Sequence, residues 1–188
     1  MEKATYLQNH FLIAMPTLAD DGFAHTVIYV CEHNEYGAIG IVINKPISMM
    51  LGEIFQQMAI SCTSLEINQI PVLAGGPIDQ ERGFVFHKPA EHQWRSTLKL
   101  SNEIAITTSK DILEAIAAEQ GPAEFVISLG YAGWSPGQLE NELKENAWLT
   151  VKASEQVLFA TPFEDRWYKS VSLLGIDPTH LSNISGHA

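Results

Sequence analysis

Short apolar runs alternate along the chain with stripes of apolar residues at helical spacing. Runs rich in β-branched and aromatic residues predict strands, and they occupy 11–15, 26–31, 39–43, 71–74, 83–87, 104–107, 124–129 and 149–151. Asn34 and Gly37 favour a turn between the second and third runs, which therefore predict a hairpin. Because these two strands are apolar on both sides, we expect both of their faces to be covered.

Apolar residues that recur three and four positions apart predict helices. This spacing spans 51–58, 109–117, 136–147 and 163–174, whereas the polar stretch 62–69 predicts a loop. The strands come in clusters, with helices interspersed but not strictly alternating with them. That order predicts an α+β fold with a mixed sheet and not a doubly wound parallel sheet.

Length and composition favour one domain, which we place at residues 1–177 and follow with a flexible tail at 178–188. A chain of 188 residues can bury about 70% of its unfolded surface, so it needs neither disulfides nor a metal to fold. No window approaches the roughly 18 apolar residues of a membrane span. The first ten residues lack the basic and long apolar regions of a secretory signal, so we expect a cytoplasmic protein without membrane association.

The chain is acidic, with 22 Asp and Glu against 11 Lys and Arg and a net charge of −11. Nucleic-acid affinity depends largely on basic side chains that neutralise phosphates. The sequence contains no run of Lys or Arg, which argues against non-specific nucleic-acid binding. The acidity favours solubility and specifies no partner.

A glycine-rich segment, GYAGWSPGQLE at 130–140, connects a predicted strand to a predicted helix, where such turns can bind phosphate. Ser135 is placed to cap the helix, Pro136 to occupy its first turn, and Gln138 to complete a capping box. The segment lacks the Lys-Ser/Thr of a P-loop and the GxGxxG spacing of a dinucleotide site. Helix initiation therefore explains these three residues better than phosphate binding does.

The remaining residues of this segment allow two interpretations. Gly130 and Gly133 are candidate ligand-binding positions, or they are required by unusual backbone angles or close packing. Trp134 is either a core residue or an exposed platform for a ligand, and the core interpretation is favoured because large aromatic side chains mostly serve packing.

Several long stretches, in order, resemble one family. They are LIAMPTLADDGFAHTVIYVCEHNEYGAIGIVINKP (12–46), GGPIDQERGFVFH (75–87), ITTSKDILEAI (106–116), LGYAGWSPGQLENELKENAWL (129–149) and RWYKSVSLLGID (166–177). Together they resemble the YqgE/AlgH family of bacterial proteins. The resemblance implies an α+β fold whose branched sheet includes a small barrel-like part and is surrounded by helices. It implies no defined reaction, although the AlgH name reflects a proposed role in alginate regulation and such proteins are sometimes called transcriptional regulators.

Cys31 is the best candidate nucleophile or redox-sensitive thiol. In an extended strand Cys31 and His33 point to the same side, and a protonated His33 would stabilise the thiolate. Glu32 opposes this, because a nearby carboxylate disfavours a second negative charge. The alternative is a buried, inert cysteine. A metal site of Cys31, His33 and His25 lacks paired ligand clusters, so we expect no metal.

Arg82 follows Gly75 and Gly76 and could bind a carboxylate or phosphate through two parallel hydrogen bonds. The alternative is a salt bridge from Arg82 to Asp79, Glu81 or a more distant acid. His87 is expected to be packed and not to act as a base, and Cys62 lacks any partner motif.

The sequence contains neither a GxSxG elbow nor an HExxH motif, and we expect no cofactor. The favoured hypothesis is a regulatory protein that binds a small ligand or a protein partner, with a reactive thiol at Cys31. The alternatives are a thiol-dependent enzyme and a transcriptional regulator that binds DNA directly.

Overall fold

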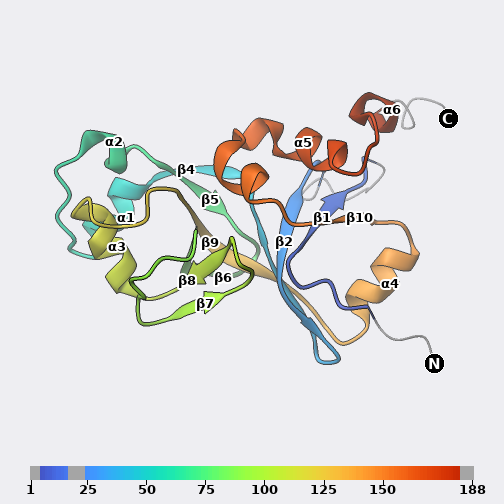
Figure 1. Cartoon of the computed structure of the whole chain (residues 1–188), viewed down its shortest axis with the longest axis horizontal. Helices are drawn as coiled ribbons and strands as arrows, with labels where there is room; N and C mark the ends of the chain where they lie inside the picture. Colours follow the sequence, from blue (N-terminus) through green and yellow to red (C-terminus); the bar gives the residue numbers. More distant parts are fainter. Residues whose placement is uncertain (1–4, 17–23, 183–188) are drawn as a thin grey trace.

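The computed structural model describes residues 5–16 and 24–182. Its strands form one ten-stranded system in the order β10-β1-β2-β3-β9-β6-β8-β7, and β5 and β4 branch from β9 (Figure 1). The strands are β1 (His10–Ala14), β2 (Val27–Asn34), β3 (Gly37–Val42), β4 (Pro46–Met50), β5 (Pro71–Ala74), β6 (Ile78–His87), β7 (Thr97–Lys99), β8 (Ala105–Thr107), β9 (Phe125–Trp134) and β10 (Trp148–Lys152).

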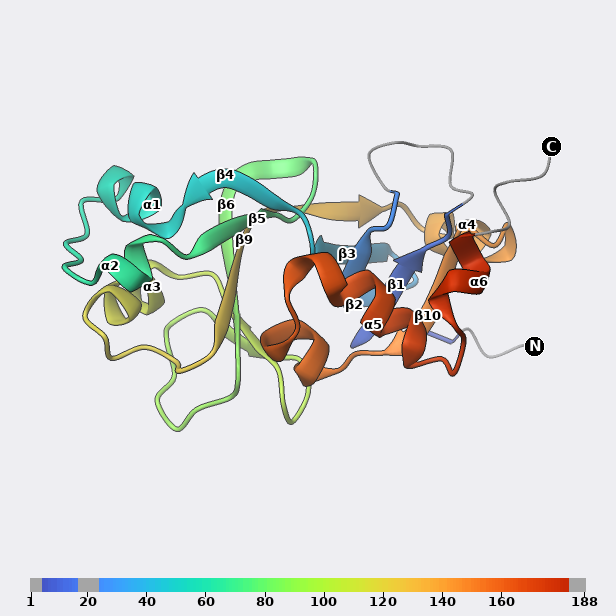
Figure 2. The ribbon, with the colours of Figure 1, turned by 90° about the horizontal axis from the view of Figure 1, so that it is seen from above.

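Helices lie at both ends of this sheet system, and α5 lies between them (Figure 2). They are α1 (Leu51–Gln57), α2 (Leu65–Asn68), α3 (Lys110–Ala117), α4 (Gln138–Lys144), the π-helix η1 (Gln156–Ala160), the 3₁₀ turn η2 (Phe163–Asp165), α5 (Arg166–Ser172) and α6 (Pro178–Ser182). The first three lie together at one end, and α4 and α6 lie at the other. None of the helices in the described ranges is both long and apolar enough to cross a membrane.

Strand β9 is the branch point of the sheet. Its last residues, Ala132 to Trp134, pair with β3, and most of its length pairs antiparallel with β6. Ser128 and Leu129 also pair in parallel with β5. The curled antiparallel part forms a half-barrel. The predicted α+β class with a mixed, branched sheet and a barrel-like part is therefore confirmed.

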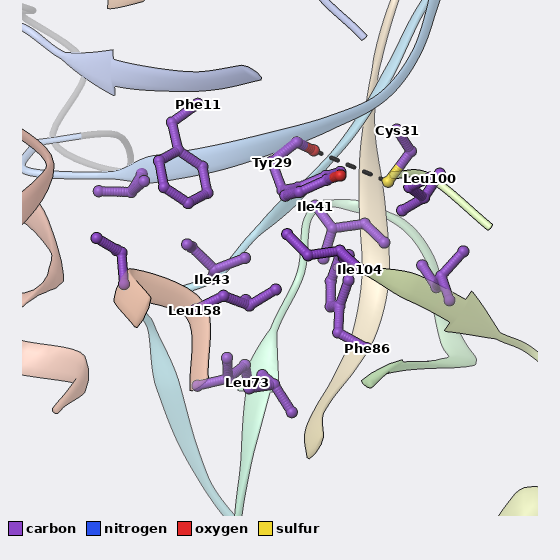
Figure 3. Close-up of a cluster of buried hydrophobic side chains, with 14 of the residues drawn as sticks. Phe11, Tyr29, Cys31, Ile41, Ile43, Leu73, Phe86, Leu100, Ile104 and Leu158 are labelled. Atoms are coloured by element: carbon purple, nitrogen blue, oxygen red, sulfur yellow. Dashed lines mark hydrogen bonds between the residues drawn. The ribbon is translucent and has the colours of Figure 1, made fainter. Parts of the chain in front are cut away.

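The predicted hairpin is formed by β2 and β3, which are joined by Glu35 and Tyr36. Val27, Tyr29 and Cys31 point into one apolar cluster, and Ile28 and Val30 point into another on the opposite face. Figure 3 shows the first cluster, in which Tyr29 lies between Phe11 and Phe86. Both faces of the hairpin are covered, as its double-sided apolar pattern predicts.

Several elements of the structure differ from the predicted segments. The predicted loop at 62–69 contains α2, whose N-cap Ser64 accepts a hydrogen bond from the Ile67 N–H at 3.3 Å. Strands β4 and β7 are unpredicted, because both are short and largely exposed. The helix predicted at 163–174 consists of η2 and α5. The predicted tail begins with α6, and its residues 183–188 lie outside the described part.

Candidate functional site

A β-bulge separates Cys31 from His33. Val30 pairs with Gly40 and Glu32 pairs with Ile39, so Cys31 is an extra residue without an opposite partner on β3. An extra residue shifts the alternation of side chains between the two faces of a strand. Cys31 therefore lies in the cluster with Tyr29, while His33 faces the other side. The prediction that Cys31 and His33 share a side is wrong for this reason.

The Cys31 thiol is buried among core side chains and only 9% exposed (Figure 3). Its Sγ lies 3.9 Å from the carbonyl oxygen of Tyr29. Burial is the larger cause that raises the pKa of the Cys31 thiol to about 12, and the negative charge of Glu32 is the smaller one. The thiol is therefore protonated near pH 7, and it lacks the exposure that a reactive thiolate needs.

His33 connects two distant segments of the chain. Its Nδ1 accepts the Leu7 N–H at 3.0 Å, and its Nε2 lies 2.8 Å from Oε1 of Glu140 in α4. Since Nδ1 is an acceptor, the hydrogen of a neutral ring is on Nε2 and is donated to Glu140. His33 thus has a structural contact set and is not available to Cys31.

The four candidate glycines allow two pieces of backbone to approach closely. A Cβ on Gly75 or Gly76 would collide with the backbone of Gly130 or Tyr131, and a Cβ on Gly130 would lie 2.5 Å from the Gly76 carbonyl oxygen. Gly130 also has a φ of 78°. Gly133 is less constrained, since a Cβ there would lie 3.0 Å from Ile78 Cδ1. The packing interpretation explains Gly75, Gly76 and Gly130 without a phosphate.

The segment predicted as a loop at 130–134 is instead the second half of β9. Trp134 is 8% exposed, and its indole N–H donates to Glu142 at 2.9 Å, so it is a core residue. Gln138 Oε1 accepts the Ser135 N–H at 3.0 Å, which is half of the predicted capping box. The helix begins later than predicted, after Gly137 with a φ of 78°.

Arg82 lines a pocket on the curled sheet, which we call the arginine pocket. It has a volume of about 380 Å³ and is lined by Cys31, Glu32, Ile39, Ile41, Arg82, Phe84, Arg95, Ser96, Thr97, Leu98, Ile106, Thr108 and Tyr131. The guanidinium of Arg82 lies over the Phe84 ring, 5.4 Å from its centre. Core side chains thus form the floor, and two arginines and several hydroxyl groups lie around it.

Arg82 and Arg95 are two of only three arginines in the chain. Within residues 5–16 and 24–182, no carboxylate lies within 4.0 Å of either guanidinium, although the backbone N–H of Arg95 donates to the Asp111 carboxylate at 2.8 Å. The predicted alternative, a salt bridge from Arg82 to Asp79 or Glu81, is therefore not formed. Sequence reasoning missed Arg95, because it lies in the segment 88–100, which carries no recognisable motif.

The other candidates lie apart from this pocket. The His87 ring is buried against Trp94 and its Nε2 lies 2.7 Å from Thr107 Oγ1, and burial lowers its pKa. His25 packs against Trp167, so His25, Cys31 and His33 do not converge. Among the described residues, no three His, Cys, Asp or Glu side chains are placed to hold a metal ion. Both Cys31 and Cys62 are free thiols.

Comparison with known proteins places the chain in a family. A family model described as AlgH-like matches residues 11–179. The chain belongs to the AlgH-like family. A UPF0301 protein of Nitrosococcus oceani is 50% identical over 188 residues and covers 100% of both chains. Another, from Vibrio parahaemolyticus, is 46% identical and covers 97% of this chain and 99% of its own.

Two solved structures share the AlgH-like fold. The solution structure of the AlgH protein from Pseudomonas aeruginosa is 46% identical, covers 100% of both chains and has a TM-score of 0.80. A crystal structure from Corynebacterium diphtheriae is 22% identical, covers 100% of this chain and 95% of its own, and has a TM-score of 0.73. The second likeness concerns the fold alone. The resemblance to the YqgE/AlgH family is confirmed.

Proposed function

We propose that this AlgH-like protein is a cytoplasmic, ligand-binding regulatory protein whose site is the arginine pocket. The ligand is a small organic anion with an apolar body. One observation carries the proposal: Arg82 and Arg95 line the same 380 Å³ pocket, and neither has a carboxylate within 4.0 Å in the described ranges. Ligand sites of this volume usually combine an apolar lining with a few polar groups that fix orientation.

The local charge of the pocket opposes that of the whole chain. With a net charge of −11, the chain repels small anions in general, so two guanidinium groups that line one pocket mark a place where an anion is favoured. Glu32 at the rim opposes binding of highly charged anions. Phe84, Ile106 and Tyr131 offer apolar and aromatic contacts to the body of the ligand.

The thiol-enzyme alternative has less support, because burial holds Cys31 in its protonated form at neutral pH. Direct DNA binding is opposed by the net charge of −11.

Docking of a protein partner is a second candidate, favoured by one observation. A hollow of about 490 Å³ next to the arginine pocket shares Glu32, Ile39 and Tyr131 with it. Its rim carries Tyr36, which is 78% exposed, and Ile78, which is 41% exposed. Exposed apolar groups that cluster in this way are typical of interaction surfaces. Replacing Tyr36 and Ile78 with serine would then weaken docking of a partner and leave anion binding unchanged.

A fluorescent aromatic anion, 8-anilinonaphthalene-1-sulfonate, tests the first proposal. We expect the native protein to bind it, and the double variant Arg82→Glu/Arg95→Glu to raise its Kd about tenfold, from pairwise charge terms of up to about 1 kcal/mol each. The matched control is Lys99→Glu/Lys152→Glu, which makes the same charge change beside a different cavity. Equal losses in both variants would mean a non-specific charge effect and would overturn the proposal.

A further inference from the structure

The third arginine, Arg166, lies at a second cavity that no sequence motif indicates. This cavity, the Arg166 groove, has a volume of about 390 Å³. It is lined by Ile70 and Pro71 at the start of β5, by the first residues of β9, by residues 159–164 and by Arg166. Its lining is mainly apolar and includes three aromatic side chains, those of Phe125, Phe159 and Phe163. The arginine pocket and the Arg166 groove have no lining residue in common.

The Arg166 guanidinium is a buried cation, with only 3% of the residue exposed. Its Nε donates to the Thr161 carbonyl at 3.0 Å, one terminal nitrogen donates to the Leu158 carbonyl at 2.6 Å, and the other donates to the Ile43 carbonyl. It also lies 4.6 Å from the centre of the Phe163 ring. These carbonyls use three of the five N–H groups of a guanidinium.

The charge of Arg166 is not neutralised by the described part of the chain. No carboxylate there comes within 4.0 Å of the guanidinium, although Glu164 also lines the groove. Burial lowers the pKa of Arg166 to about 10, so the group is still charged at neutral pH. Carbonyl groups and an aromatic face supply partial negative charge, whereas buried cations normally have an anionic partner.

The backbone beside this cation is also unusual. Residues Gln156–Ala160 form a π-helix, which contributes Phe159 and Ala160 to the groove and the Leu158 carbonyl to Arg166. π-helical turns are rare and often occur at functional sites. A purely structural role for Arg166, in which it connects α5 to Ile43 after β3 and to the segment 158–161, explains its three hydrogen bonds. It explains neither the absence of a carboxylate within 4.0 Å among the described residues nor the apolar groove beside Arg166.

We propose that the Arg166 groove binds a small monocarboxylate with an aromatic or short alkyl body. The carboxylate would accept hydrogen bonds from the remaining N–H groups of Arg166, and the body would pack against Phe125, Phe159 and Phe163. The single buried cation favours one negative charge. This site is independent of the arginine pocket and stands even if that pocket binds nothing.

The test uses phenylacetate and its uncharged analogue phenylacetamide with the full-length variant Arg82→Glu/Arg95→Glu, which removes the other anion site. We expect phenylacetate to bind with a Kd on the order of 1 mM, as ten non-hydrogen atoms allow. Phenylacetamide should bind at least tenfold more weakly. Chemical-shift changes in the amides of residues 159–166 would locate the site.

Substitution of Arg166 itself risks unfolding the protein, so the location of the site is tested with a variant that fills the groove instead. Ala160 is exposed and lines the groove, and Ala160→Trp should fill it and abolish binding of phenylacetate. Ala118→Trp, at an exposed helix end away from the groove, is the matched control and should bind normally. Equal binding of acid and amide, undiminished binding by Ala160→Trp, or no binding of phenylacetate by the parent would each overturn the proposal.

Discussion

Trp134 and Trp148 donate their indole N–H groups to the same atom, Oε2 of Glu142, at 2.9 Å and 2.8 Å. Trp134 is the last residue of β9 and Trp148 is the first residue of β10, so Glu142 connects the end of β9 to the start of β10. Gln138 Nε2 donates to the other oxygen of the same carboxylate at 3.2 Å. A single side chain of α4 thereby satisfies two largely buried indoles.

Replacement of Glu142 with alanine should destabilise the fold by about 2–4 kcal/mol, because two hydrogen bonds to a charged group are lost and their donors stay largely buried. Urea unfolding followed by tryptophan fluorescence measures this free energy. Glu145→Ala is the control, since Glu145 is exposed at the end of the same helix. A difference of less than about 0.5 kcal/mol between the two variants would contradict the shared role of Glu142.

Substitutions at Gly130 and Gly137 distinguish the free-energy cost of a left-handed backbone from the cost of a steric collision. Both have a φ of 78°, but a Cβ on Gly130 would lie 2.5 Å from the Gly76 carbonyl oxygen, whereas a Cβ on Gly137 has no neighbour within 4 Å. Gly137→Ala should therefore cost only the left-handed penalty of about 1–2 kcal/mol. Gly130→Ala should cost clearly more. Thermal unfolding of the two variants gives the comparison, and equal costs would show that the backbones of β9 and the β5–β6 connection can separate easily.

Cys31 should resist alkylation in the folded protein. In a Cys62→Ser background, we expect iodoacetamide to react slowly with Cys31 at neutral pH and rapidly once urea unfolds the chain. Because burial raises the pKa of this thiol from 9.0 to about 12, stability is retained below about pH 9 and decreases as pH rises from there toward 12. Fast reaction of the native protein, with a midpoint below 9, would restore the thiol-enzyme hypothesis.

Glu140 should make the stability depend on acid pH. Burial by itself would raise the pKa of Glu140, but hydrogen bonds from its own backbone N–H and from His33 outweigh burial and lower it below 4.5. Its contribution is therefore complete above about pH 5 and is lost as pH falls below 4.5. The Tm difference between the native protein and Glu140→Gln should shrink over that acid range. A difference that stays constant would show that the His33 contact does not favour the ionised carboxylate.

The sequence predicts the strands and helices with strong apolar periodicity, because burial of one or two faces determines those patterns. It could not predict the bulge at Cys31, since the extra residue is visible only from the pairing of Val30 and Glu32 with β3. Gly130 and Gly133 indicated a turn, yet they lie within β9. Gly130 is required by the close approach of the Gly76 backbone, which depends on tertiary packing.

The candidate site was predictable only in part. Arg82 is a candidate from the sequence because it follows Gly75 and Gly76 and can bind an anion through two parallel hydrogen bonds, and the structure places it at a pocket. The curl of the sheet places Arg95 at the arginine pocket, and the π-helix lies beside Arg166 at the Arg166 groove. Neither the curl nor the π-helix has a local sequence signal. The Phe84 and Tyr131 side chains of the pocket floor are likewise brought together only by the pairing of β6 with β9.

The pairing of β1 with β10 joins residues 10–14 to residues 148–152. During synthesis from the N-terminus, β1 can meet β2 early, but its outer edge must wait until nearly the whole chain has been made. Until then the nascent protein presents an open strand edge flanked by apolar side chains. Such edges invite pairing with other chains, and contacts this distant in sequence form slowly. A growing chain is therefore most exposed to aggregation in the interval before β10 covers this edge.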